Sequence, residues 1–295
     1  MEFRHSVGLF QEGKAVKYYD NIESLNVSLE QFNNPLPISR LALKELRKVE
    51  YKEKIIHANM LLVKKLIADS VNTDTHIIQA INSIEELDKV CNTLVKRIRE
   101  WYGYYYPELE HQIQDNETFI KLLLEKSKNE FMVESNQQIS MGPDLDSKDL
   151  DTILTFARQV DDMYLQRSKL VTYIDNVMIK YCPNMYSLTG AIIGAKLLER
   201  ARSLKHLAML PSSTVQLLGA EKALFRHLRN KNIRPPKHGL ILSHPLVMGA
   251  RRDMRGTAAR LFASKVSIAA KIDYFHGEFI GDKLLQELEK KLKGK

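Results

Sequence analysis

The sequence predicts an α+β protein that is mostly α, with a small N-terminal α/β domain at residues 1–75, a long antiparallel coiled-coil arm at residues 76–182 and a basic, helical C-terminal domain at residues 183–295. Three observations support this prediction. β-branched and aromatic residues flank an early glycine turn, apolar residues recur at spacings of three and four along two long stretches, and positive charge gathers in the last part of the chain. With 295 residues and 44% hydrophobic content, the chain is long enough to form two or three domains, each with a core.

The N-terminal domain is expected to begin with a β-hairpin. Residues 6–10 and 15–19 are rich in β-branched and aromatic side chains, and the segment between them contains Gly13. Two strands need a covering helix, and Ser39 is a suitable N-cap for a helix from residue 40 to about residue 69. The apolar residues expected to cover the strands are Leu43, Leu46, Val49, Ile55, Ile56, Leu62 and Leu66.

Two apolar seams predict the arm. The first consists of Ile84, Leu87, Cys91, Leu94, Ile98, Trp101 and Tyr105. The second has Arg167 as its one polar member and otherwise consists of Leu150, Ile153, Ala157, Val160, Tyr164, Val171, Ile174, Met178 and Tyr181. Alternating spacings of three and four are typical of coiled-coil helices. Residues 141–147 have the turn and cap chemistry to reverse the chain, so we expect an antiparallel pair, extended by a helical segment at residues 116–134.

The seams leave two interpretations open. In the first, they close a helical bundle within one chain. In the second, the arm also self-associates, and the expected contacts of a homodimer are Leu94, Ile98, Val160 and Ile174.

In the C-terminal domain, residues 213–216 form a capping-box pattern, which predicts that a helix begins there. Gly219 interrupts this helix, because glycine in a helix interior costs roughly 1 kcal/mol relative to alanine. Beyond it, Ala220, Leu224 and Leu228 recur at fourth positions and are expected to face a core. The side chains of Lys222, Arg226 and Arg229 fall on a different, cationic face.

Positive charge is concentrated in this region. Residues 222–265 carry eleven Lys or Arg and the single acid Asp253, a net charge of +10, whereas the whole chain carries +8. Residues 183–295 carry +13 and residues 1–182 carry −5. Such a one-sided surface repels itself unless a polyanion is nearby, and the planar fork of arginine suits phosphate. We therefore expect nucleic-acid binding in the C-terminal domain; the alternative is a solvated basic face.

The sequence contains no pattern typical of a catalytic or metal site. Cys91 and Cys182 lack the spacing of a zinc site or a disulfide framework. There is no phosphate loop and no nucleophile elbow, and His238 and His244 are expected to make RNA or packing contacts. No apolar run approaches the roughly 18 residues of a membrane span, and the N-terminus lacks a signal-peptide core, so a cytoplasmic location is expected.

Four segments around the basic stretch carry a family resemblance: LPSSTVQLL at 210–218, GAEKALFRH at 219–227, RPPKHG at 234–239 and SKVSIAAKIDYF at 264–275. From about residue 181 to residue 275 the chain resembles the Nop domain of archaeal box C/D ribonucleoprotein core proteins and of their nucleolar and spliceosomal relatives. Upstream the resemblance rests on residues 101–103, 106–109 and 140–142.

The resemblance implies a non-catalytic scaffold of a box C/D guide ribonucleoprotein. Its expected partners are a box C/D guide RNA, a ribosomal-protein-like protein that binds the kink-turn of that RNA, and a fibrillarin-like enzyme that performs guided RNA 2′-O-methylation in rRNA or tRNA processing. S-adenosylmethionine would bind to the enzyme, and residues 1–75 of this chain would dock it. Two alternatives remain: a spliceosomal-type Nop-domain protein, and a coiled-coil adaptor with a basic patch for a membrane surface.

The candidate residues for binding RNA and its proteins follow from the basic pattern and the resemblance together. They are Gly219, Ala220, Glu221, Lys222, Ala223, Leu224, Phe225, Arg226, His227, Arg229, Arg234, Lys237, Arg251, Arg252, Arg255, Arg260 and Lys265.

Overall fold

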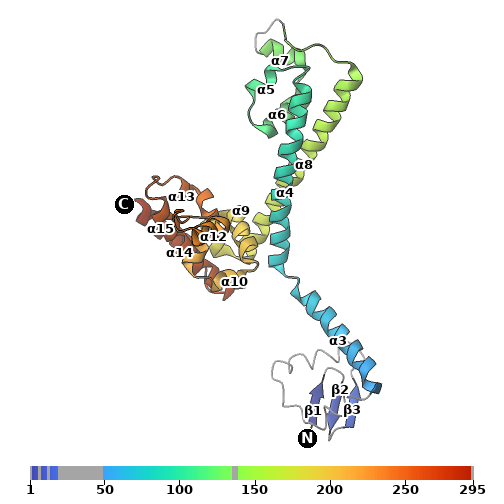
Figure 1. Ribbon diagram of the computed structural model, residues 1–295, viewed down its shortest axis with the longest axis vertical. Helices are drawn as coiled ribbons and strands as arrows, with labels where there is room; N and C mark the ends of the chain where they lie inside the picture. Colours follow the sequence, from blue (N-terminus) through green and yellow to red (C-terminus); the bar gives the residue numbers. More distant parts are fainter. Residues whose placement is uncertain (1, 6–7, 12–13, 19–48, 135–138, 294–295) are drawn as a thin grey trace. The chain divides into compact units, whose positions relative to one another are not determined.

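The computed structural model describes residues 2–5, 8–11, 14–18, 49–134 and 139–293 (Figure 1). The chain divides into two compact units, Met1–Asn72 and Thr73–Lys295. The first boundary therefore lies between Asn72 and Thr73. The expected arm and the C-terminal domain belong to one unit.

The first unit contains an antiparallel sheet in the order β1-β2-β3. The strands are β1 (Glu2–His5), β2 (Gly8–Gln11) and β3 (Lys14–Tyr18), and β2 and β3 form the predicted hairpin. Strand β1 carries no strand signal in the sequence, because its four residues include no β-branched side chain.

Helix α3 (Val49–Ser70) ends close to the predicted position. Ser39, Leu43 and Leu46 lie outside the described residues. Ile56 and Leu66 were expected on the covering face, but they are 52% and 53% exposed, so that prediction is wrong for these two residues.

In the second unit, two long antiparallel helices pack side by side: α4 (Thr73–Tyr102) and α8 (Ser147–Tyr181). Three shorter helices lie at one end of this pair, in the upper part of Figure 1: α5 (Glu108–Gln112), α6 (Asn116–Glu125) and α7 (Lys128–Glu134). The predicted extension at 116–134 is thus helical, with a break between α6 and α7. Most of the second seam is buried, because its period matches the contact between the helices.

The first seam differs from the prediction at one end. Ile84, Cys91 and Ile98 are fully or almost fully buried, but Trp101 is 40% exposed. Tyr102 is buried in its place. A straight helix has 3.6 residues per turn, so a seam of 3.5-residue period drifts around the helix. By the end of α4, Tyr102 therefore occupies the inward position that was expected for Trp101.

The apolar contacts of α4 and α8 belong to two separate cores. One core contains Ile84 and Ile174 and continues into the C-terminal helices, whereas the other contains Cys91 and Tyr164 and extends into α5–α7. Arg167, the polar member of the second seam, donates a hydrogen bond to the carboxylate of Asp88 on α4, a bond that raises the pKa of Arg167. The polar position therefore marks the place where one core ends and the next begins.

Three of the four residues expected to contact a second chain lie inside this one. Ile98, Val160 and Ile174 are 0% exposed, because they pack between α4 and α8 or their neighbours. Their assignment as dimer contacts is therefore wrong, and only Leu94 is partly exposed.

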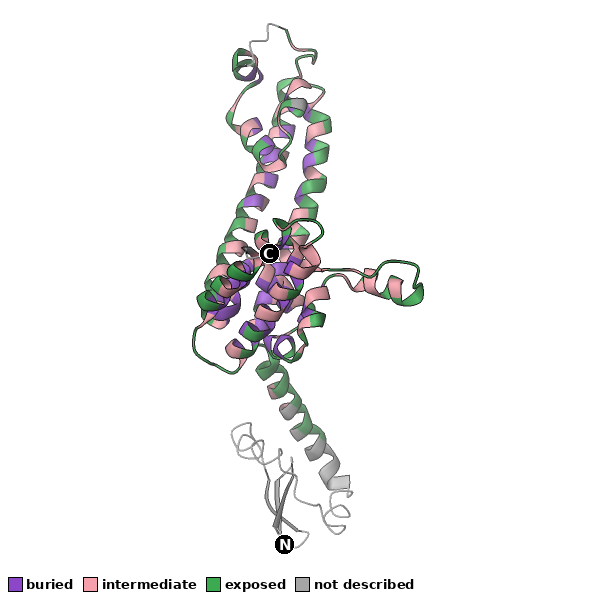
Figure 2. Ribbon diagram, turned by 90° about the vertical axis from the view of Figure 1, so that its left-hand side faces the viewer, coloured by how far each residue is buried: buried purple, intermediate pink, exposed green. Residues whose placement is uncertain are grey.

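The C-terminal helices pack around α14 (Arg255–Tyr274). Most buried residues of the C-terminal domain lie in these helices (Figure 2). The helices against α14 are α9 (Pro183–Ala201), α10 (Leu204–Met209), α11 (Ser212–Leu217) and α15 (Gly281–Lys293). Five alanines of α14 are buried and allow close approach: Ala258, Ala259, Ala263, Ala269 and Ala270.

Asp273, near the end of α14, fixes the start of α9. Its carboxylate accepts hydrogen bonds from the backbone N–H groups of Asn184, at 3.1 Å, and Met185, at 2.8 Å. Burial raises the pKa of Asp273, and these bonds partly offset the effect.

Among the described helices, none is long and apolar enough to cross a bilayer.

Candidate nucleic-acid interface

A basic projection, residues 219–238, extends from the C-terminal domain (Figure 2). It contains α12 (Glu221–Arg229) and the loop that follows. None of the residues of α12 is buried. The projection is therefore held by its base, and not by a packed face.

Backbone pairing closes the base of the projection. The N–H of Gly239 donates to the carbonyl oxygen of Gln216 at 2.9 Å, and the N–H of Leu240 donates to that of Leu218 at 2.7 Å. The side-chain amide of Gln216 donates to the carbonyl oxygen of Lys237 at 2.6 Å. The predicted helix start is confirmed, because α11 begins at Ser212, but the predicted capping box is wrong. The helix has no side-chain cap, and Gln216 joins the two ends of the projection.

Two glycines make this base possible. Gly219 has φ of +85°, a conformation that L side chains rarely adopt, and a Cβ there would lie 2.5 Å from Cγ of Leu240. At Gly239 a Cβ would lie 1.9 Å from the carbonyl oxygen of Leu218. The predicted break at Gly219 is confirmed. Gly239 is not among the candidate residues, although a glycine three positions after Pro236 was an available signal.

Two candidate residues bind within the projection itself. The Glu221 carboxylate accepts a hydrogen bond from the N–H of Gly219 at 2.7 Å. The ring of His227 donates from Nδ1 to the carbonyl oxygen of Ile233 at 2.5 Å, because a carbonyl can only accept. Both side chains shape the projection.

Helix α12 exposes a cationic side and an apolar side. Lys222, Arg226 and Arg229 are exposed, and Phe225 and Leu228 are 60% and 56% exposed. Ala220 and Leu224, which were expected to face a core together with Leu228, are only half-buried. That prediction is wrong because no element packs over this side of α12 closely enough to bury it.

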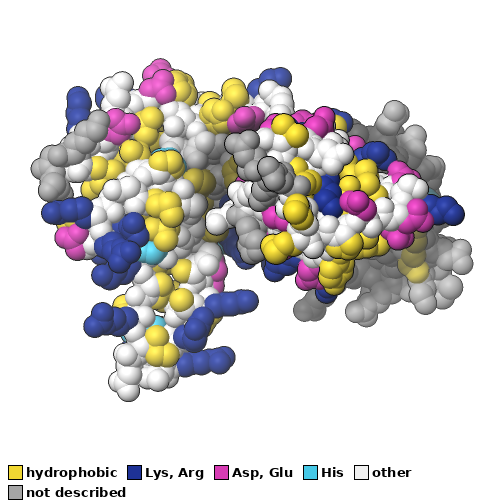
Figure 3. All heavy atoms as spheres, turned by 90° about the horizontal axis from the view of Figure 1, so that it is seen from above, with side chains coloured by type: hydrophobic (Ala, Val, Ile, Leu, Met, Phe, Trp, Pro, Cys, Tyr) yellow, Lys and Arg dark blue, Asp and Glu magenta, His cyan; other side chains and the backbone are white. Residues whose placement is uncertain are grey.

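Three further cations meet in a hollow of about 450 Å³ between the end of the projection and the first turns of α14. Arg234 and Lys237 line it from the loop, and Arg260 lines it from α14, with Asp253 as the one acid. Lys and Arg side chains lie along the projection and beside it (Figure 3). The hollow and α12 together can bind several phosphate groups.

The remaining four basic candidates divide into two pairs. Arg251 and Arg252 are exposed. Arg255 instead donates to the carbonyl oxygens of Ala250, at 3.2 Å, and Met248, at 3.0 Å. Lys265 forms a 2.5 Å ion pair with Glu287 on α15, and its side chain is only 13% exposed. Arg255 and Lys265 therefore make contacts within the chain and stabilise the fold.

His244 makes packing contacts. Its ring lies 4.5 Å from the ring of Phe262, and Nδ1 accepts a hydrogen bond from the N–H of Leu246 at 3.3 Å. Burial lowers the pKa of His244, so the neutral form is favoured.

Within the described residues, no three His, Cys, Asp or Glu side chains come together as metal ligands.

The basic projection lies within a recognised sequence family. Residues 83–294 match the family model described as "Nop: snoRNA binding domain, fibrillarin". The chain belongs to the Nop family.

Three relatives show the breadth of the Nop-family similarity. An uncharacterised NOP5 family protein of Methanocaldococcus jannaschii is 38% identical over 260 residues, covering 82% of this chain and 62% of that protein. Nucleolar protein 56 of Saccharomyces cerevisiae is 37% identical, covering 74% and 48%. Nucleolar protein 58 of Schizosaccharomyces pombe is 38% identical, covering 68% and 42%. This chain thus spans less than two thirds of the length of each of these relatives.

One solved structure, titled as a fibrillarin/Nop5p complex, has the same fold as the Nop-family chain. The two share 23% sequence identity with a TM-score of 0.50, and the match covers 100% of this chain and 99% of the other.

Proposed function

We propose that the chain is a non-catalytic scaffold of an archaeal-type box C/D guide ribonucleoprotein, which joins kink-turn RNA and its bound protein to a fibrillarin-like enzyme for RNA 2′-O-methylation. The observation that carries this proposal is the basic projection, which is closed at its base by backbone hydrogen bonds and exposes both cationic and apolar side chains. Membership of a family described as a snoRNA binding domain supports it.

The two sides of α12 favour composite recognition. Lys222 and Arg226 suit phosphates, whereas Phe225 suits a protein surface or an unstacked base. Phe225 is 60% exposed on a helix without buried residues, so most of its apolar surface is left uncovered within the chain. RNA already shaped by a kink-turn protein offers both kinds of contact side by side.

A gel-shift experiment tests this proposal. The chain is titrated against a box C/D RNA, with and without a kink-turn protein, and against anionic vesicles. We expect tight binding only to the RNA–protein complex, and Phe225→Ala should weaken that binding more than binding to bare RNA. Equal affinity for bare and protein-bound RNA would contradict composite recognition, and preferential binding to vesicles would favour the membrane-surface alternative.

The first unit, Met1–Asn72, is the proposed docking site for the methyltransferase. The cations of the interface all lie in the second unit, so the first unit is free to serve another partner. S-adenosylmethionine would bind to that partner. A chain of residues 73–295 should still bind RNA but should no longer support guided methylation in a reconstituted particle. Full methylation by this shortened chain would rule out the docking role.

The proposed homodimer uses the outer side of α4. Val90 and Trp101 are 45% and 40% exposed, and Leu94 is partly exposed between them. Their spacings of four and seven place these three residues on one side of the helix. Val90→Glu with Trp101→Glu should halve the mass in sedimentation while the helix content stays unchanged. A wild-type chain that sediments as a monomer would disprove the dimer.

A further inference from the structure

The loop at residues 139–144 leads into α8 at the end of the arm, where two charged side chains hold it in place. The Glu108 carboxylate accepts a hydrogen bond from the N–H of Met141 at 2.8 Å. The buried ammonium group of Lys128, on α7, donates to the carbonyl oxygen of Gly142 at 2.9 Å. The loop therefore has a defined place against the two segments that supply these groups.

This loop and its neighbours expose large apolar side chains. A Cβ on Gly142 would lie 2.3 Å from the carbonyl oxygen of Tyr105, so the loop is in direct contact with the segment that follows α4. The exposed apolar residues of these segments and of α7 are Tyr104 (69%), Val133 (77%), Ile139 (86%) and Met141 (83%). Met141 is thus bound through its backbone while its side chain faces solvent. Apolar surface that is gathered in this way is typical of a protein–protein contact.

The same end of the arm is acidic. Residues 103–146 carry nine Asp or Glu and three Lys, a net charge of −6. All three lysines form ion pairs within this region: Lys121 with Glu117 at 2.8 Å, Lys126 with Glu134 at 2.5 Å and Lys128 with Asp144 at 3.1 Å. Figure 3 views the molecule from above Figure 1, the side on which α5–α7 lie, and shows apolar and acidic side chains side by side there. The cations of this region are paired, and its excess charge is negative.

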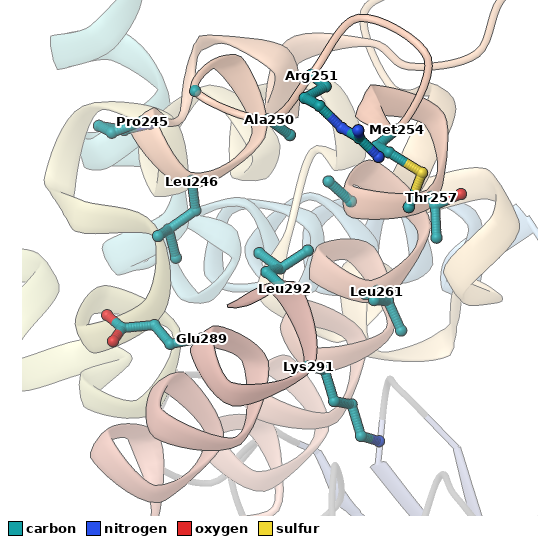
Figure 4. A pocket seen from close by; sticks show the side chains of 12 residues that line it. Pro245, Leu246, Ala250, Arg251, Met254, Thr257, Leu261, Glu289, Lys291 and Leu292 are labelled. Atoms are coloured by element: carbon teal, nitrogen blue, oxygen red, sulfur yellow. The ribbon is translucent and has the colours of Figure 1, made fainter. Parts of the chain in front are cut away.

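A pocket of about 360 Å³ in the C-terminal domain carries charges of both signs instead (Figure 4). It lies where α15 and α13 (Pro245–Met248), which follows the 3-10 helix η1 (Leu240–Ser243), meet α14. Figure 4 shows Arg251 and Lys291 on opposite sides of this pocket, and Glu289 also lines it. The charges around the pocket therefore favour no class of occupant, whereas those at the end of the arm favour a cation.

We propose that the end of the arm docks a basic segment of a partner protein, which packs an aliphatic or aromatic side chain against Tyr104 and Met141 and places Lys or Arg side chains beside Asp144. Burial of apolar surface supplies affinity, at about 25 cal/mol per Å². The opposite charge guides association and selects the segment. Nucleic acids and anionic membranes are repelled by a net charge of −6. A second copy of this surface is disfavoured for the same reason. The inference goes beyond the proposed scaffold function and does not depend on it.

Methyl NMR on the full chain locates the surface with defined peptides. The probe is the capped peptide Lys-Leu-Lys-Phe-Lys, and its comparison peptides are Lys-Ser-Lys-Ser-Lys and Glu-Leu-Glu-Phe-Glu. Carbon-13 labels on methionine methyl groups report on Met141 at the end of the arm and on Met248, which is 55% exposed in the C-terminal domain. We expect the probe to shift the Met141 signal saturably and to leave Met248 unchanged. The serine peptide should bind more weakly, and the acidic peptide should not bind.

Fluorescence anisotropy of the labelled probe compares matched variants. Tyr104→Ser removes apolar surface without changing the charge and should weaken binding roughly tenfold, whereas Tyr173→Ser, at a 43% exposed tyrosine of α8, should not. Asp144→Asn should weaken binding about twofold at low salt, whereas Asp162→Asn, on α8, should not. Gly142→Ala displaces the loop but keeps every charge and exposed side chain, so it should also weaken binding. Thermal unfolding confirms that each variant is folded.

Four outcomes would overturn the proposal. They are equal affinity for the probe and the serine peptide, a shift of Met248 in place of Met141, unchanged affinity of folded Tyr104→Ser, and a lower mass of Tyr104→Ser than of the wild type in sedimentation. The last outcome would assign the surface to a second copy of the chain. Because the basic projection is intact in every variant, RNA affinity reports separately on the proposed scaffold function.

Discussion

Gly239 lies so close to Leu218 that a Cβ on the glycine would be 1.9 Å from the leucine carbonyl oxygen. That oxygen accepts the hydrogen bond of the next residue, Leu240, at 2.7 Å. The contact joins the two ends of the basic projection. The position of every cation on the projection therefore depends on a residue that carries no charge.

Replacing Gly239 by alanine should open this base. The Cβ displaces Leu218 and breaks the two backbone hydrogen bonds, at a cost of about 2 kcal/mol. Differential scanning fluorimetry should show reduced stability, and RNA affinity should fall with it. Gly256→Ala is the matched control: its Cβ meets only the Lys237 side chain, at 3.6 Å, and alanine is the better helix former, so stability should be equal or higher. Equal stability of Gly239→Ala and the control would refute the steric argument.

Removing Lys222 and Arg226 together should weaken RNA binding at low salt and flatten its salt dependence. Each lost phosphate contact reduces the slope of log K against log salt by roughly 0.7–0.9. Lys265→Met serves as the control, because Lys265 is already neutralised by Glu287. Gel shifts at several salt concentrations measure both slopes. A larger effect at Lys265 than at the α12 pair would move the interface away from the projection.

Arg99→Lys should destabilise the end of the arm. The guanidinium of Arg99 donates to the carbonyl oxygens of Ile113, at 2.8 Å, and Gln114, at 3.2 Å, and lies 4.1 Å from the ring centroid of Phe119. An ammonium group cannot make these contacts together, so we expect a loss of about 2 kcal/mol in chemical denaturation. The control is Arg97→Lys, two positions away, which should change stability little because the Arg97 side chain is exposed. Equal losses would mean that the fork geometry is unimportant.

The ion pair between Asp88 and Arg167 should contribute little. Their side chains are 42% and 35% exposed, so solvent screens the pair and a double-mutant cycle with Asp88→Asn and Arg167→Met should give a coupling of about 0.5 kcal/mol. The coupling should decrease in high salt. A value that is several times larger and insensitive to salt would show that the pair behaves as a buried one.

Asp74→Asn should change the pH dependence of stability. Burial raises the pKa of Asp74 above its ordinary value of 3.8, although the N–H of Leu204 and the hydroxyl of Tyr181 oppose the effect. An acid whose pKa is higher in the folded state contributes stability below its unfolded pKa, and this contribution is lost as the pH rises through the folded pKa. Relative to Asp74→Asn, the wild type should therefore lose free energy of unfolding as the pH rises above about 4. Urea denaturation at several pH values measures both free energies of unfolding. If they changed with pH in parallel for the wild type and Asp74→Asn, the predicted loss would be contradicted.

The long helices and the location of the positive charge follow from the sequence alone. The recurrence of Ile153, Ala157 and Val160 predicted their common burial, because the period of a helix is a local property of the chain. The net charge and its division between the two parts of the chain need no coordinates. The break at Gly219 also follows from the residue alone, since glycine adopts a positive φ without a steric penalty.

The contacts of individual side chains, in contrast, depend on the tertiary structure. Lys222 and Lys265 both belong to the basic stretch of the sequence. In the structure, however, Lys222 is exposed and Lys265 pairs with Glu287. Arg167 looked like an exception in a seam until Asp88, 79 positions away, was placed opposite it. The apolar side of α12 predicted a core contact, but no element buries it. Periodicity records which side of a helix a residue occupies, whereas its partner depends on contacts between distant segments, and these leave no period in the sequence.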